Sequence, residues 1–224
     1  MSAPDVVAKK LSSHLVAGFP SEADWQLASP VSFCADWQGK NADPQRSTEV
    51  RLLWSAEELY LRFDCRYREL FTFESADRPD GRRDHLWDRD VAEAFLQPDR
   101  FGEKYYREFE VSPNGFWIDL EITPDPEPID LNSGLRRTVL LDKNRKVWIA
   151  QLAIPMKSIT REFDPQKPWR ANFFRCEGRD PERAYLAWRA TNTPQPQFHV
   201  PQAFGVLTFE GKCTFPPATH ILHL

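Results

Sequence analysis

The stretch YYREFEVSPNGFWIDLEI, residues 105–122, decides the fold class because its side chains alternate with the two-residue period of β-strands. Alternation runs to Val111, where Ser112-Pro-Asn-Gly115 supplies turn residues, since Asn-Gly favours positive φ. The return segment places its even-numbered residues, from Phe116 to Ile122, on one face. Trp117, Asp119 and Glu121 fall on the other. The stretch therefore predicts a β-hairpin.

Two further hairpins are predicted on the same grounds. Residues 48–54 and 59–67 form one, joined by a turn at 55–58, and the second strand alternates from Leu59 to Tyr67. Residues 137–141 and 147–154 form the other, joined by the polar turn 142–146.

Additional strands are predicted at residues 91–96, 169–176, 184–190 and 204–209, whereas only 156–161 indicates a short helix. Many short strands joined by hairpin turns are typical of an all-β fold. We predict an antiparallel β-sandwich, immunoglobulin-like or jelly-roll-like, with little helix.

The 224-residue chain shows no internal repeat and no linker-like Gly/Ser stretch. We therefore predict a single domain over residues 1–224, with its core over about 24–210 and flexible ends. The long loops at 71–87 and 123–133 are candidates for functional segments.

Net charge and hydropathy exclude several classes of partner. A charge of −4 and a pI near 5.8 argue against a nucleic-acid surface, and no apolar run is long enough for a membrane helix. The N-terminus lacks the pattern of a signal peptide, so we expect a cytoplasmic protein, or a secreted one if a leader has been removed. Cys34, Cys65, Cys176 and Cys213 lack metal or redox spacing and are expected to be free thiols. The oligomeric state is not predicted.

Two groups of carboxylates are candidates for chemistry. Within the hairpin, Glu108 and Glu110 share a face, and we expect Asp119 and Glu121 to lie opposite them. Such a face is a solvated surface, a cation site for which calcium is the natural ion, or a catalytic pair. The second group precedes and enters the strand at 91–96: Asp88, Asp90 and Glu93.

Arg107 breaks the hairpin pattern, because it shares its face with Tyr105, Phe109 and Val111. A buried unpaired charge is costly, so Arg107 must find a partner. Two alternatives remain: it pairs with a carboxylate such as Glu93, or it donates to a ligand from the floor of a polar site.

Aromatic side chains in charged surroundings suggest sugar binding, because a pyranose has an apolar face and a polar rim. Trp87 in LWDRDVAE and Trp188 in YLAWRATN have such surroundings. Trp54, Trp148 and Trp169 lie in or beside predicted strands and are assigned to the core.

Common catalytic motifs are not found: the sequence has no Gly-rich phosphate loop, no Gly-x-Ser-x-Gly and no His-Glu-x-x-His. The histidines are scattered along the chain. For His199, in PQFHVPQAFG, we favour a structural hydrogen bond over a role in a site.

The order of these segments resembles that of the family 9 carbohydrate-binding modules and their stand-alone relatives, which share a β-sandwich with the DOMON domains. The resemblance covers roughly residues 24–209 and rests on six stretches in the order of the family: VRLLWSAEELYLRFDCRY, LWDRDVAEAFLQPD, YYREFEVSPNGFWIDL, VWIAQLAIPMKSI, WRANFFRCEG and YLAWRATNTPQPQFHVPQAFGVLTF.

This resemblance implies a non-catalytic module that clamps a sugar or the end of a polysaccharide chain between two tryptophans. Trp87 and Trp188 are then the two walls. Glu93, in the family's D-x-V-E pattern, and Arg107 are then the groups that bond sugar hydroxyls. The family often contains structural calcium, whose ligands the sequence does not identify, so the metal site is unknown and no cofactor is certain. Many members are fused to xylan-degrading enzymes.

Three hypotheses follow from the residues and the resemblance. The leading one is carbohydrate binding, with a mono- or oligosaccharide partner and a role in polysaccharide catabolism. The alternative is a glycoside hydrolase that uses a pair of the carboxylates above. A haem module like some DOMON proteins ranks last, because the only methionines are Met1 and Met156.

Overall fold

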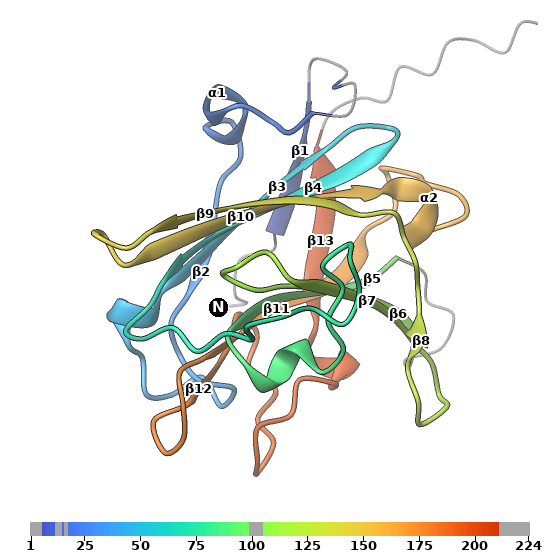
Figure 1. The fold of residues 1–224 in the computed structure, drawn as a ribbon. Helices are drawn as coiled ribbons and strands as arrows, with labels where there is room; N and C mark the ends of the chain where they lie inside the picture. The colour runs from blue at the N-terminus through green and yellow to red at the C-terminus, as the bar shows by residue number, and fades with distance from the viewer. Residues whose placement is uncertain (1–5, 12–14, 16–17, 99–104, 211–224) are drawn as a thin grey trace, which may run out of the picture.

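The computed structural model describes residues 6–11, 15, 18–98 and 105–210, which form a β-sandwich (Figure 1). The strands are β1 (Val6–Lys10), β2 (Val31–Phe33), β3 (Thr48–Trp54), β4 (Glu58–Arg66), β5 (Val91–Gln97), β6 (Tyr106–Val111), β7 (Trp117–Ile122), β8 (Ile129–Asp130), β9 (Arg136–Asp142), β10 (Val147–Pro155), β11 (Trp169–Glu177), β12 (Ala184–Ala187) and β13 (Gly205–Glu210). The α-helices are α1 (Glu22–Trp25) and α2 (Met156–Ile159), and 3₁₀ turns lie at Pro44–Arg46, Leu86–Asp88 and Pro201–Ala203. No helix in these ranges has both the length and the apolar character needed to cross a bilayer. The prediction of a β-sandwich with little helix is confirmed.

The strands join into one curled sheet in the order β8-β7-β6-β5-β11-β13-β1-β3-β4-β10-β9, with β12 paired to β11 and β2 to β3. In Figure 1, β3, β4, β10 and β9 form the upper layer and β5, β6, β7 and β11 the lower one. The sheet is mixed rather than purely antiparallel, because β1 runs parallel to both β13 and β3.

The N-terminal strand β1 corrects the predicted domain boundary. The core was expected to begin near residue 24, yet β1 lies inside the sheet, and Val6 and Ala8 are fully buried. A five-residue strand that ends in two lysines carries too little alternation to be found from sequence, so its place depends on the strands on both sides of it.

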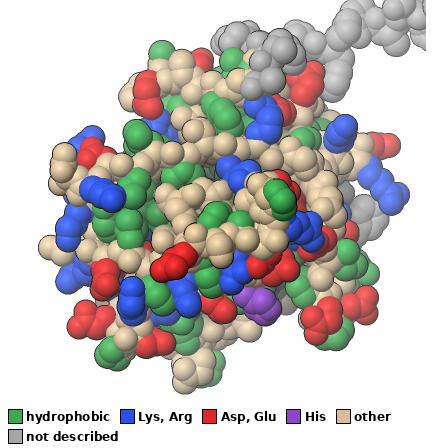
Figure 2. All heavy atoms as spheres, viewed as in Figure 1, with side chains coloured by type: hydrophobic (Ala, Val, Ile, Leu, Met, Phe, Trp, Pro, Cys, Tyr) green, Lys and Arg blue, Asp and Glu red, His purple; other side chains and the backbone are tan. Residues whose placement is uncertain are grey.

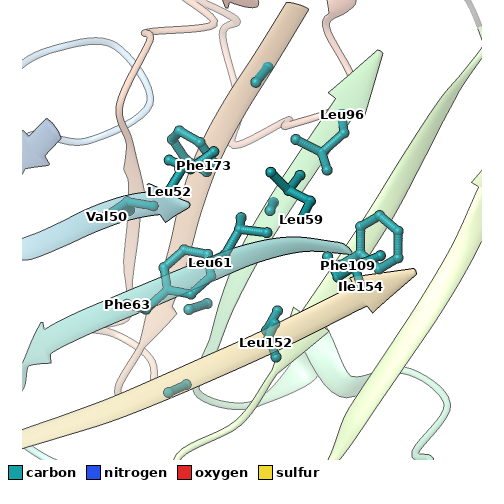
Figure 3. Close-up of a cluster of buried hydrophobic side chains, with 14 of the residues drawn as sticks. Val50, Leu52, Leu59, Leu61, Phe63, Leu96, Phe109, Leu152, Ile154 and Phe173 are labelled. Carbon is teal, nitrogen blue, oxygen red and sulfur yellow. The ribbon is translucent and has the colours of Figure 1, made fainter. Parts of the chain in front are cut away.

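The main core lies between the two layers of the sandwich (Figure 3). Leu52, Leu61 and Leu152 of the upper layer face Phe109 and Phe173 of the lower layer, and all five are fully buried. This packing explains why alternate residues of the predicted hairpins face the interior of the sandwich.

A second cluster, here called the outer core, covers the opposite face of β5, β6, β7 and β11. It contains Phe95 and Phe174 from the sheet, and Leu86, Phe198 and Phe204 from segments that cross over it. Strand β5 is therefore buried on both faces, which explains why VAEAFLQ is nearly continuously apolar instead of alternating.

The hairpin of β6 and β7 forms as predicted. Gly115 has φ of +86°, and the amide of Ser112 donates to the carbonyl of Phe116 at 2.9 Å. Each residue of β6 faces one of β7 over the whole length, from Tyr106 opposite Ile122 to the turn.

The register of this hairpin corrects the expectation that four acidic side chains share a face. Glu108 lies opposite Leu120, so Glu108 and Glu110 point to the outer core. Asp119 and Glu121 alternate with Leu120 and point to the other side of the sheet. The two acidic pairs are thus separated by the sheet itself.

The described cysteines agree with the prediction of free thiols. Cys65 and Cys176 are buried and Cys34 is half-buried, and none of the three forms a disulfide. Cys213 lies outside the described residues.

Two leucine substitutions test the assignment of the main core. Leu61 is fully buried and Leu140, on the edge strand β9, is 64 % exposed. We expect Leu61→Ala to lower the free energy of unfolding by about 2–5 kcal/mol because it leaves a cavity. The matched change Leu140→Ala should alter it by less than about 0.5 kcal/mol. Chemical denaturation measures both, and equal effects would contradict the assigned orientation of β4 and β9.

Candidate functional site

A cavity of about 510 Å³ lies on the outer face of the lower layer. Four strands contribute its floor: Glu93 of β5, Glu108 of β6, Leu120 of β7 and Cys176 of β11. These side chains converge because the strands are adjacent and all four residues point to the same face.

Aromatic side chains form much of the cavity wall. Trp87 comes from the turn Leu86–Asp88, Tyr185 from β12, and Phe198 with His199 from the segment before β13. The ring of Phe198 stacks on Phe174 of β11 at 4.2 Å between centroids, which fixes this wall to the sheet. The loop from Ile122 to Pro128 closes the remaining side.

Trp87 is held by contacts to its backbone. The Arg183 guanidinium donates to the carbonyl of Trp87 at 2.7 Å and to that of Arg89 at 3.0 Å. The ring of His85, a residue with φ of +54°, lies 5.0 Å from the Trp87 ring. Trp87 is half-buried and packs against the outer core, which leaves part of the indole facing the cavity.

Asp90 anchors the beginning of β5 just behind Trp87. Its buried carboxylate accepts hydrogen bonds from the amides of Phe71, at 3.1 Å, and Gly178, at 2.7 Å. Burial raises the pKa of Asp90 to about 6, and the nearby Arg175 opposes this shift. These bonds give Asp90 a structural role and leave Glu93 as the acid of this segment that reaches the cavity.

The carboxyl groups of Glu93, Glu108 and Glu110 form a buried cluster, here called the acidic triad. One oxygen of each lies within 4.8 Å of the others, and their exposed fractions are 2 %, 2 % and 0 %. The cluster forms because Glu93 lies directly opposite Glu110 in the register of β5 and β6, with Glu108 next on the same face.

Few protein groups donate hydrogen bonds to the carboxyl oxygens of the acidic triad. The Cys176 thiol donates to Glu93 at 3.7 Å, a weak contact. Both oxygens of Glu110 and one of Glu108 have no hydrogen-bond partner among the described residues. Buried charges of this kind are normally paired, so the triad must acquire protons or a cation.

Burial raises the pKa of Glu93 and Glu110 well above the ordinary value, and the neighbouring carboxylates raise both further. Arg183 opposes the shift of Glu93 through its charge, and it donates hydrogen bonds to the backbone carbonyls of Trp87, Arg89 and Gly178. Glu93 and Glu110 therefore retain protons at pH values where free glutamate is ionised.

The Tyr106 hydroxyl and the His199 Nδ1 atom are 2.6 Å apart at the edge of the outer core. Burial raises the pKa of Tyr106, so the hydroxyl stays protonated and shares a hydrogen bond with Nδ1. In the tautomer in which Nδ1 accepts, the imidazole carries its proton on Nε2, which gives the cavity wall a donor. The predicted structural bond of His199 is present, and the same residue lines the cavity.

Trp188 does not meet Trp87, which corrects the predicted tryptophan clamp. Its amide donates to the carbonyl of Phe173 at 2.9 Å, and its ring lies 5.5 Å from that of Phe173 in the main core. Trp188 also packs tightly on Gly205, where an added Cβ would come within 2.7 Å of the indole. The two tryptophans therefore lie on opposite faces of the sheet.

The alternation along β12 explains this placement. Tyr185 pairs with Cys176 and faces the cavity, whereas Leu186 belongs to the main core and Trp188, two residues later, follows its direction. The same two-residue period in the sequence indicates Tyr185 as the aromatic of this segment that reaches the site, a signal that the search for tryptophans missed.

Arg107 does not reach Glu93, which is a further correction. Its Nη1 atom pairs with Oε1 of Glu121 at 2.9 Å, directly across the hairpin. Both side chains lie on the sheet face opposite the acidic triad and border a separate hollow with Ile159 and Lys167. The unusual position of Arg107 is thus explained by an ion pair at the open edge of the sandwich.

The structure is a β-sandwich with an aromatic and acidic pocket on one sheet face, and its fold is shared by known proteins. Residues 129–209 match the model of carbohydrate-binding family 9. A candidate carbohydrate-binding protein from Bacteroides uniformis is 18 % identical, with 92 % of this chain and 98 % of that chain covered and a TM-score of 0.71. A family 9 module from Caldicellulosiruptor kristjanssonii in complex with cellotriose is 14 % identical, with 93 % and 95 % covered and a TM-score of 0.65.

A curated relative, an extracellular protein of Arthroderma benhamiae, is 24 % identical over 182 residues, which span 74 % of this chain and 80 % of that protein. These matches agree with the resemblance seen in the sequence: residues 129–209 are similar to carbohydrate-binding family 9, and the fold is that of the two solved structures. The matched segment 129–209 contains the wall residues Tyr185, Phe198 and His199. The residues of the acidic triad lie before this segment, so the family model matches part of the cavity wall but not the triad.

The raised carboxyl pKa values predict a pH-dependent stability. Between the ordinary glutamate pKa and the raised values, the folded state binds more protons than the unfolded state, so the free energy of unfolding falls as pH rises. Glu110→Gln removes one of these groups, and we expect its melting temperature relative to wild type to increase from pH 5 to pH 8.

Thermal denaturation across this pH range measures the effect, with exposed Glu74→Gln as the control that should leave the difference flat. A Glu110→Gln variant that loses stability equally at both pH values would show that a partner stabilises the ionised carboxylate.

Proposed function

We propose that the protein is a non-catalytic carbohydrate-binding module whose ligand occupies the cavity above the acidic triad. The apolar face of a pyranose stacks on Trp87, and Tyr185, Phe198 and His199 surround it. The sugar hydroxyls donate to Glu93 and Glu108. The observation that supports this proposal is a pocket with aromatic walls and convergent polar groups at its floor.

The ligands of the structural relatives guide the choice of sugar. The Caldicellulosiruptor kristjanssonii module is known in complexes with cellotriose and with glucose. We propose β-linked glucose oligomers as the first ligands to test, with xylo-oligosaccharides beside them for the xylan association expected from the family. Affinity should be roughly micromolar to millimolar, because a few solvent-competed hydrogen bonds and one or two ring contacts supply the binding energy.

Two tryptophan variants test the location of the sugar. Isothermal titration with glucose, cellobiose, cellotriose and xylotriose should detect binding by wild type. Trp87→Ala should weaken it by about tenfold or more, since ring stacking and the associated burial are worth on the order of 1–2 kcal/mol.

Trp188→Leu is the matched control for this test. It should lower thermal stability because Trp188 packs on Phe173 and Gly205, yet leave affinity within about twofold. The opposite result, with binding lost in the Trp188 variant and retained in Trp87→Ala, would refute the proposed site.

Hydrolysis is the rival function, because two acids of the cavity floor lie close together. Oxygens of Glu93 and Glu108 lie within 4.8 Å of each other, near the roughly 5 Å separation of retaining glycosidases. We expect no release of reducing sugar from the oligosaccharides that bind. Release that disappears in Glu93→Gln would replace the binding proposal with an enzyme.

A further inference from the structure

The charge of the cavity is unbalanced. Among the described residues that line it, Glu93, Glu108 and Asp125 are acidic, and none is lysine or arginine. Glu110 lies directly behind this floor and belongs to the same cluster. The pocket therefore offers many acceptors, and the basic group that acts on its floor is Arg183, which lies over the Tyr185 ring and interacts with Glu93 through its charge.

Glu110 supplies an independent indication that the ligand carries positive charge. Its side chain is fully buried, and the groups that act on it are carboxyls: Glu93 and Glu108 of the triad, and Asp88. A neutral sugar would donate hydroxyl groups to the floor but leave the buried negative charge uncompensated, which is costly. Without a cation, the triad avoids this cost only by keeping its protons.

The dimensions of the triad fit a primary ammonium group. The three oxygens lie within 4.8 Å of one another, and in an equilateral triangle with sides of that upper limit a central nitrogen is about 2.8 Å from each corner, the usual length of an N⁺–H···O⁻ bond. An ammonium group has three donors and no acceptor, which matches three carboxylates. The aromatic rings around the floor attract a cation as well.

A bare divalent ion would also fit three carboxylates, but it would leave the rest of the cavity without a function. The volume of about 510 Å³ and the walls of Trp87, Tyr185 and Phe198 suit a carbon skeleton attached to the charged group.

We propose that this cavity is selective for amino sugars: the protonated amine of a 2-amino-2-deoxyhexose, free or at the end of a chain, is bound by Glu93, Glu108 and Glu110 while its ring stacks on Trp87. The inference rests on the proposed sugar-binding function and narrows its ligand class. It assigns to Glu110, which lies behind the cavity floor, the role of the third acceptor of the amine.

Titration with three hexoses of the same skeleton tests this selectivity. With protein treated with EDTA, glucosamine should bind about tenfold or more tightly than glucose or N-acetylglucosamine, because charge-assisted hydrogen bonds are the stronger ones. Trp87→Ala should weaken all of the binding that occurs, which places the amine in the same cavity.

Glu110→Gln tests the contribution of the triad. We expect it to remove most of the preference for glucosamine over glucose, measured as the ratio of the two affinities, with circular dichroism confirming the fold. Glu74→Gln, an exposed acid, is the control and should keep the full preference.

Several outcomes would overturn the inference. Equal binding of glucose and glucosamine would remove the selectivity while leaving the sugar-binding function intact. Neutral-sugar binding that requires added calcium chloride, with glucosamine excluded, would assign the triad to a metal ion. Failure of every sugar to bind, with and without calcium, would instead reject the proposed function itself.

Discussion

The register of β5, β6, β7 and β11 is the constraint on which the site depends. Side chains alternate between two faces of each strand, so one register assigns every residue of the lower layer either to the main core or to the cavity. Glu93, Glu108 and Glu110 meet only in this register. A slip of one residue would place all three in the main core, where no cavity could receive a ligand.

The segments that cross over the outer core are required both for the stability of the sheet and for the construction of the site. The outer core covers a face that would otherwise expose Phe95 and Phe174, and the segments that provide this cover also bring Trp87, Tyr185 and His199 to the cavity. Stability and ligand binding thus share the same side chains. On the face shown in Figure 2, acidic and basic side chains are interspersed.

Local patterns in the sequence were sufficient for most of the strands, since alternation and the Asn114–Gly115 turn are properties of short stretches. They could not identify β1, whose place depends on strands remote in sequence, or the partner of Arg107, which is set by the hairpin register. Trp87 was singled out from its charged surroundings and Glu93 from the resemblance to family 9, and both line the cavity. Trp188 was predicted as the second wall of the clamp because the resemblance favoured tryptophan, whereas the period of β12 directs Trp188 to the main core and Tyr185 to the cavity.

The acidic triad could not be predicted from the sequence, because neither the burial of Glu110 nor its pairing with Glu93 can be read from one strand.

The most direct measurement of the central claim is a crystal structure of the protein with its tightest-binding saccharide. The account predicts a pyranose ring in van der Waals contact with the indole of Trp87, at about 3.5–4 Å, and a polar atom of the sugar hydrogen-bonded to Glu93 or Glu108. A saccharide bound beside Trp188, or in the hollow that Arg107 borders, with the cavity above the acidic triad left unchanged, would contradict it.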